Sequence, residues 1–197
     1  MPGPMYQKTI VLSGLCWISL TNGLVFGQMT GMISALQKKE GGIDLSENEI
    51  TIIASSFVML TLIGYWSAAI ISDKFGRRWS FISFSILLAF YWFIIYIANN
   101  MTMFMVSRII GGISFGALFS LCICITSEYT SPDNRGFFLN LITTASPAIG
   151  TGFGHFLGII FHWRNVALIG ILFTTIGIFV PYFWVESPHW LAIRGKF

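Results

Sequence analysis

Long apolar stretches, separated by short polar turns, follow one another along the whole sequence. A membrane-spanning helix needs about 20 consecutive, mostly apolar residues. Six stretches of about this length or longer cover residues 9–36, 49–71, 79–98, 103–127, 137–161 and 164–185. They lack the alternation of a barrel strand, and in lipid every backbone donor and acceptor must be satisfied within the protein. We therefore predict an all-α, polytopic membrane protein with six transmembrane helices.

The polar turns agree with these helix limits. Ser46 and Glu49 stand three residues apart just before the second stretch, which is the sequence signature of a capping box. The first stretch continues past Leu24 without a small-residue cleavage site, so we interpret it as a retained span and not as a removed signal peptide. The loop at residues 37–45 is too short to hold a separate outer domain.

Glycines recur at every fourth position in three of the stretches. Residues four apart share one helix face, and small residues on that face let two helix backbones approach closely. The pattern predicts that the first and fifth spans each pack tightly on a neighbour. The rows are Gly23, Gly27 and Gly31; Gly112 and Gly116; and Gly150, Gly154 and Gly158.

The composition excludes the water-soluble classes of protein. Hydrophobic residues make up 55% of the 197 residues and charged residues 10%, against roughly 25% charged in an average soluble domain. So few charges cannot cover a soluble enzyme, and a net charge of +3 is too small to indicate a nucleic-acid partner. We therefore expect a lipid bilayer to surround the protein. Cys16, Cys122 and Cys124 lie in apolar stretches, so no disulfide, metal site or cofactor is expected.

The positive residues predict the orientation of the helices. One side of the predicted topology carries seven Lys and Arg residues, and the other side carries three. Positive residues favour the cytoplasm, so we expect both termini inside and a multi-pass protein, most simply in the plasma membrane. The three are Lys38, Lys39 and Arg164, and the seven are Lys8, Lys74, Arg77, Arg78, Arg135, Arg194 and Lys196.

One short pattern imitates a catalytic motif. Residues 112–116 read G-I-S-F-G, which has the spacing of a serine-hydrolase nucleophile, and His155 or His162 would be its base. That motif needs a strand-to-helix turn, whereas this segment lies within a predicted helix and its glycines are explained by packing. We therefore expect no catalytic residue and interpret His155 as a packing residue.

Charged residues gather where the even-numbered spans end on the expected cytoplasmic side. Carboxylates and guanidiniums at one membrane face can form bidentate pairs between helix ends. Such pairs can break and form again when helix bundles rock. We interpret the set as a cytoplasmic gate and not only as topology determinants. Its members are Asp73, Arg77, Arg78, Glu128, Arg135 and Glu186.

Five short motifs occur in the order and spacing of one transporter family. D-R-x-G-R-R matches residues 73–78 with one substitution, and R-x-x-x-G-x-x-x-G matches residues 108–116. E-x-x-x-P-x-x-R-G matches residues 128–136, the W-R of G-W-R matches residues 163–164, and P-E-S-P-R-W-L matches residues 185–191 with two substitutions. Together they resemble the N-terminal half of a major facilitator superfamily sugar porter, in the style of glucose facilitators and insect facilitated trehalose transporters.

This resemblance implies an architecture and a mode of action. Residues 1–197 would form one six-helix half-bundle, built as an inverted pair of three-helix repeats. Two such halves rock against each other around a midplane site, and the charged gate ties helix ends together when the transporter is open outward. The implied partners are a small solute, with a sugar as the expected class, and either a missing C-terminal half or a second copy of the chain.

Departures from the family pattern bear on the mechanism. Many proton-coupled sugar porters carry an Asp in a G-Y-D pattern in the first span, where this chain has Gly27-Gln28-Met29. No Asp or Glu lies in the middle of a predicted span, and a proton relay through lipid needs an ionisable group. The resemblance thus points to facilitated diffusion. Hexose porters usually carry Gln where this chain has Thr143 and Gly150, which argues against a hexose as the substrate.

Polar residues within the spans are the candidates for the solute pathway. An unpaired Arg in a span costs about 2.5–3.5 kcal/mol, so Arg108 should face the bundle interior or reach the outer interface. Other polar side chains there need a hydrogen bond to a helix, to water or to the solute. The pathway candidates are Gln28, Arg108, Thr143, Thr144 and Ser146.

Two alternatives to a transporting half stay open. The chain could have lost transport and act as an interaction or regulatory partner of full-length relatives. It could also belong to the organic-ion branch of the same superfamily, which shares the Glu-Ser-Pro segment after the sixth span. Members of that branch usually have a large first outer loop with cysteines, which the short loop at residues 37–45 does not match.

Overall fold

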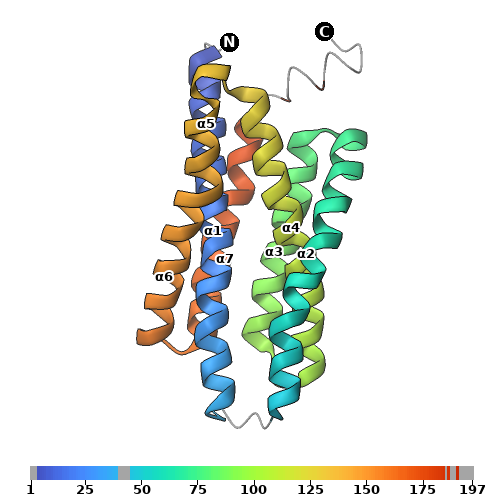
Figure 1. The fold of residues 1–197 in the computed structure, drawn as a ribbon, viewed down its shortest axis with the longest axis vertical. Coiled ribbons are helices and arrows are strands. Elements are labelled where there is room, and N and C mark those ends of the chain that lie inside the picture. Colours follow the sequence, from blue (N-terminus) through green and yellow to red (C-terminus); the bar gives the residue numbers. More distant parts are fainter. Residues whose placement is uncertain (1–3, 40–44, 185, 187–189, 191–197) are drawn as a thin grey trace.

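The computed structural model describes residues 4–39, 45–184, 186 and 190, and these residues form a bundle of helices with no strand among them. The helices stand side by side along the long axis (Figure 1). In chain order they are α1 (Pro4–Gln37), α2 (Glu47–Phe75), α3 (Arg77–Ile97), α4 (Met101–Tyr129), α5 (Pro132–Asn140), the π-helical η2 (Leu141–Ala145), α6 (Ser146–Ile160), α7 (Trp163–Phe179) and the 3₁₀-helical η3 (Val180–Phe183).

Local side-chain caps fix where several helices begin. The predicted capping box is confirmed, because the Ser46 amide donates to Glu49 Oε2 at 2.8 Å and the Glu49 amide donates to Ser46 Oγ at 3.3 Å. Asn100 caps α4 by accepting from the Met103 amide at 3.0 Å. Each cap satisfies an amide that the first helical turn leaves without a partner.

Five of the described segments are long and apolar enough to cross a membrane, by length and composition alone. The prediction of a polytopic helical membrane protein therefore agrees with the structure. The predicted limits differ by a few residues at most ends because caps and turns set them. The five segments are Gln7–Gln37, Glu47–Phe75, Arg77–Ile97, Met101–Tyr129 and Trp163–Phe183.

The predicted fifth span differs from one uninterrupted helix. Residues 137–161 fall in α5, η2 and α6, which follow one another without a gap and have 9, 5 and 15 residues. The physical reason is Pro147, which has no amide hydrogen to donate to the carbonyl four residues earlier. The backbone widens into a π-turn there, and Ser146 donates its amide to Leu141 O.

Glycine contacts bring α1 and α6 together along most of α6. A methyl group at Gly23 would collide with the carbonyl oxygen of Pro147, and one at Gly150 would collide with that of Leu20. The prediction that the first and fifth spans each pack tightly on a neighbour is therefore confirmed, and each is the neighbour of the other. Thr151 Oγ1 also donates across this contact to Gly23 O at 3.1 Å.

Helices α2 and α4 meet in the same manner. A methyl group at Gly116 would collide with Thr61 O, and one at Gly64 would collide with Ile113 O. These two helix pairs make the most extensive packing in the bundle. Helices α3 and α7 pack on each other. In addition, α3 packs on α4, and α7 packs on α1. The two tight pairs thus stand next to a common pair of supporting helices.

Candidate functional site

The charged cluster at the helix ends is centred on Arg77, the first residue of α3. Its Nε donates to Glu128 Oε1 at 3.1 Å, and its Nη1 donates to Asp73 Oδ1 at 2.8 Å and to Ser72 O at 3.0 Å. The Arg77 and Glu128 side chains are only 11% and 10% exposed, whereas that of Asp73 is 75% exposed. One guanidinium therefore links the ends of α2, α3 and α4.

Glu186 contacts the N-terminal end of α3, an interaction that the sequence did not indicate. Its Oε1 accepts from the backbone amides of Arg77 at 2.8 Å and Arg78 at 3.1 Å, so it caps the N-terminus of α3. Negative charge is favourable there because the first amides of a helix are unpaired and the helix dipole is positive. Gly76, at φ 96°, leaves space for the Glu186 carboxylate, because a methyl group on it would lie 2.7 Å from Glu186 Oε2.

The other two arginines of the predicted gate lie differently. Arg78 donates to Tyr182 O at 2.9 Å, and its guanidinium carbon is 6.0 Å from the centre of the Tyr182 ring. Arg135 is exposed in the first turn of α5 and donates to Thr130 O at 3.4 Å. Among the described residues no ion pair joins Arg135 to the others. We call Asp73, Arg77, Arg78, Glu128 and Glu186 the helix-end cluster.

Arg108 is buried in the interior of the bundle and does not reach an interface. Its side chain is fully buried, Nη2 lies 3.4 Å from the sulfur of Met32, and the guanidinium carbon is 5.7 Å from the Phe57 ring and 6.0 Å from the Tyr91 ring. Nε and Nη1 have no protein partner among the described residues. Burying a guanidinium without a carboxylate partner costs free energy of folding, so stability alone does not explain an arginine at this position.

Two buried amide side chains on α1 also lack a protein hydrogen-bond partner among the described residues. Gln28 and Asn22 are each 1% exposed, and neither the nitrogen nor the oxygen of either amide has a protein hydrogen bond among the described residues. Gln28 was predicted from its place in the span, and Asn22 was missed. The signal for Asn22 was present, since it is the amide residue nearest to Gln28 within the same apolar stretch.

Of the three predicted hydroxyl residues, Thr143 and Thr144 lie within η2, and Ser146 follows it directly. Thr143 Oγ1 donates to Leu139 O at 2.8 Å within its own helix. Ser146 is buried at the first position of α6, and Thr144 is exposed. Of the three, Thr144 is therefore the one with an exposed side chain.

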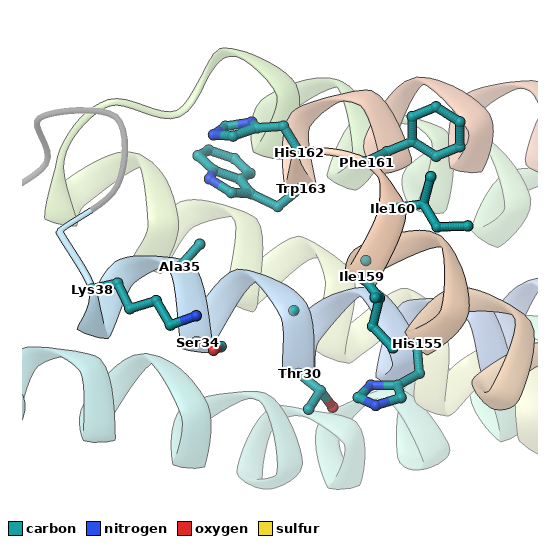
Figure 2. A pocket seen from close by; sticks show the side chains of 12 residues that line it. Thr30, Ser34, Ala35, Lys38, His155, Ile159, Ile160, Phe161, His162 and Trp163 are labelled. Carbon is teal, nitrogen blue, oxygen red and sulfur yellow. The ribbon is translucent and has the colours of Figure 1, made fainter.

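A cavity of about 570 Å³ lies at the end of the bundle opposite the helix-end cluster (Figure 2). It opens between the last turns of α1 and α6 and the turn that leads into α7, and we call it the far-end cavity. The interpretation of His155 as a packing residue is wrong: His155 is exposed and lines this cavity. Its polar and aromatic lining comprises Thr30, Ser34, Lys38, His155, Phe161, His162 and Trp163.

The sequence reasoning missed the cavity because it weighed His155 alone. The signal lay on α1, where Thr30, Ser34 and Lys38 recur at every fourth position beside the glycine row. Residues at this spacing share a helix face. Gly154 packs on α1 next to Gly27, so the neighbouring His155 is turned away from that contact.

Comparison with known proteins gives one family and several relatives. The model of the Major Facilitator Superfamily matches residues 11–193. "Sugar transporter ERD6-like 9" of Arabidopsis thaliana is 28% identical over 90% of this chain and 53% of the relative. "Arabinose-proton symporter" of Bacillus subtilis (strain 168) is 27% identical over 88% of this chain and 40% of the relative. The chain thus spans about half or less of the length of these relatives.

Solved structures agree on the fold. A partially occluded inward-open structure of the xylose transporter XylE from E. coli matches with a TM-score of 0.82, at 17% identity over 96% of this chain and 53% of that one. The human organic anion transporter MFSD10 matches with a TM-score of 0.73, at 22% identity over 95% of this chain and 49% of that one. At these identities the likeness concerns the fold alone.

Proposed function

The chain belongs to the Major Facilitator Superfamily, and we propose that it forms the N-terminal six-helix half of a transporter that carries a sugar by alternating access. Residues 1–197 are one half-bundle in this proposal, in which the continuous run α5, η2 and α6 is the fifth span and α7 is the sixth. Sugar is the proposed solute because the relatives reported above are named as a sugar transporter and an arabinose symporter. Those relatives are transporters, not enzymes, and we assign no catalytic residue.

The packing of the helices supports a pair of inverted three-helix repeats. Exchanging α1 with α4, α2 with α6 and α3 with α7 turns the tight α1–α6 contact into the tight α4–α2 contact. The same exchange turns α1–α7 into α4–α3 and leaves α3–α7 unchanged. Inverted repeats of this kind place the solute site near the midplane, between the halves of the transporter.

The observation that carries facilitated diffusion, as opposed to proton symport, is the environment of Arg108. Among the described residues its near neighbours are a thioether and two aromatic rings, and not a carboxylate that could exchange a proton with a solute. A charge held inside a membrane bundle marks a solute or ion pathway by default. The acidic residues of the described chain lie at helix ends and turns: Glu47, Glu49, Asp73, Glu128, Asp133 and Glu186.

The helix-end cluster supports a gate on the cytoplasmic side. Its ion pairs and the Glu186 cap link the ends of α2, α3 and α4 with the segment after η3. We assign this end to the cytoplasm because most of the Lys and Arg residues lie there, which places the far-end cavity outside. The multi-pass protein is assigned to the plasma membrane.

A panel of solutes tests the proposal. The complete transporter that contains this chain is reconstituted in proteoliposomes, and counterflow of labelled arabinose, glucose, trehalose and an organic cation is measured. Saturable counterflow of a sugar is the expected result. Counterflow of the cation alone would favour the organic-ion branch. Sugar binding without counterflow of any solute would favour a non-transporting interaction partner. The same measurement on this chain alone tests whether two copies of it suffice for transport.

A further inference from the structure

The far-end cavity has the size of a small-molecule site. Its volume of about 570 Å³ falls inside the range of roughly 300–1,000 Å³ that is usual for ligand pockets. In Figure 2, Lys38 reaches along α1 toward Ser34, and His162 and Trp163 stand on the opposite wall. Three separate helices therefore contribute to one hollow.

The polar lining of the cavity is cationic and rich in hydrogen-bond donors. Lys38 supplies an ammonium group, His155 and His162 supply imidazoles, and Thr30 and Ser34 supply hydroxyls. Among the described residues that line the cavity there is no Asp or Glu. The side chains of Lys38 and His155 have no hydrogen bond or ion pair with any described residue.

The helix termini around the cavity carry partial charges of both signs. Helix α7 starts at Trp163, so its positive dipole end faces this region. Helices α1 and α6 end here with their negative carbonyl ends, after the regular bonds from Lys38 N to Ser34 O at 3.2 Å and from Phe161 N to Leu157 O at 2.8 Å. The positive charge of the cavity therefore comes from its side chains. Lys39, at φ 56°, closes α1 by donating its amide to Leu36 O at 3.0 Å.

We propose that the far-end cavity binds a phosphate-type oxyanion, held by the Lys38 ammonium and by hydrogen bonds from His155, His162 and the hydroxyl of Ser34. Charge-assisted hydrogen bonds of this kind are about twice as strong as neutral ones. The site is separate from the midplane solute site and does not depend on transport. The same chemistry has two sources, a phospholipid headgroup at the membrane surface or a soluble phosphate.

Isothermal titration of inorganic phosphate into the protein in neutral phosphatidylcholine nanodiscs tests the proposal. Saturable binding is expected, and Lys38→Gln should weaken it about tenfold, whereas the neighbouring Lys39→Gln should change it less than about twofold. Ser34→Ala removes one donor and should weaken binding by roughly threefold through the lost hydroxyl. Circular dichroism spectra that match the unsubstituted protein establish that each variant is folded.

A second titration in nanodiscs that contain anionic phosphatidylglycerol identifies the source. If a headgroup is the natural occupant, the apparent affinity for phosphate falls in these discs; if soluble phosphate is the occupant, the affinity is unchanged. Both results support an oxyanion site. Absence of saturable binding in neutral discs, or equal losses in the Lys38 and Lys39 variants, would overturn the proposal.

Discussion

Arg108 shows how a single residue can indicate function through what surrounds it. Its guanidinium is buried against Met32, Phe57 and Tyr91, and two of its nitrogens have no protein partner among the described residues. Stability alone does not explain such a group, because an unpaired buried charge costs several kcal/mol. A charge held inside a membrane bundle marks a candidate for the solute pathway, and a substitution can test it.

Replacing Arg108 separates stability from transport. Arg108→Met removes a buried, unpaired charge and should leave the free energy of unfolding unchanged or raise it by roughly 1 kcal/mol. Counterflow of the sugar should fall at least about tenfold, equivalent to ~1.4 kcal/mol in the barrier. Thermal unfolding in detergent and proteoliposome counterflow are measured in parallel. Normal counterflow would show that Arg108 is not part of the pathway.

Gly76 is required by both its backbone and its neighbour. Gly76→Ala places a side chain at φ 96° and against the Glu186 carboxylate, so it should lower the free energy of unfolding by about 1–3 kcal/mol. Gly136→Ala is the matched control, because a methyl group at Gly136 meets nothing within 4 Å. The two thermal unfolding midpoints are compared. Equal midpoints would show that the Glu186 cap adds no stability.

At the scale of residues, the sequence could predict what is local. The capping box at Ser46 and Glu49 depends on neighbours three residues apart and was found. The cap that Glu186 places on α3 joins residues 109 positions apart, and only the fold brings them together. His155 was misjudged for the same reason: its exposure depends on how α6 is rotated against α1, which the glycine contacts decide.

At the scale of elements, the apolar stretches and the glycine rows contained most of the information. Five spans followed from length and hydropathy. The interruption at residues 141–145 did not, because the prediction followed the apolar pattern and gave no weight to Pro147. The rows predicted close packing of the first and fifth spans. The glycine rows did not identify the partner helix, because a helix face made of small residues can pack closely against any other such face.

The α1–α6 contact can be tested with two glycines on one helix. Gly150→Leu drives a side chain into the backbone at Leu20 and should lower the free energy of unfolding by about 1–3 kcal/mol. Gly152→Leu is the control, since nothing lies within 4 Å of its added Cβ. Unfolding in denaturing detergent, followed by circular dichroism, measures both. If the two variants unfold alike, the tight contact is absent in the membrane.

In the molecule as a whole, the proposed gate sets a balance between two states. Each partly exposed ion pair of the helix-end cluster should contribute only about 0–1 kcal/mol on its own. Glu128 is only 10% exposed and pairs with Arg77, so removing its charge leaves the nearly buried guanidinium paired with the exposed Asp73 carboxylate. A tenfold shift between two states needs ~1.4 kcal/mol, which such a change can supply.

Glu128→Gln should therefore shift the complete transporter toward its inward-open state. A cysteine at Thr30 reports this better than one at Gln28, because Thr30 is exposed and Gln28 is buried. Labelling of Thr30→Cys by an impermeant maleimide from outside should slow by up to about tenfold when Glu128→Gln is added. Asp133→Asn, which removes an exposed acid of the same region, is the control and should leave labelling unchanged. Unchanged labelling in both would end the gate assignment.

The central claim is that this superfamily member equilibrates a sugar and does not pump it. The most direct measurement is the final concentration of labelled arabinose inside proteoliposomes of the complete transporter under an imposed inward proton gradient. Because no carboxylate in the described part of the chain lies beside Arg108 to exchange a proton, the inner concentration should rise to equal the outer one and stop there. Accumulation above the outer concentration, abolished when a protonophore collapses the gradient, would contradict the account.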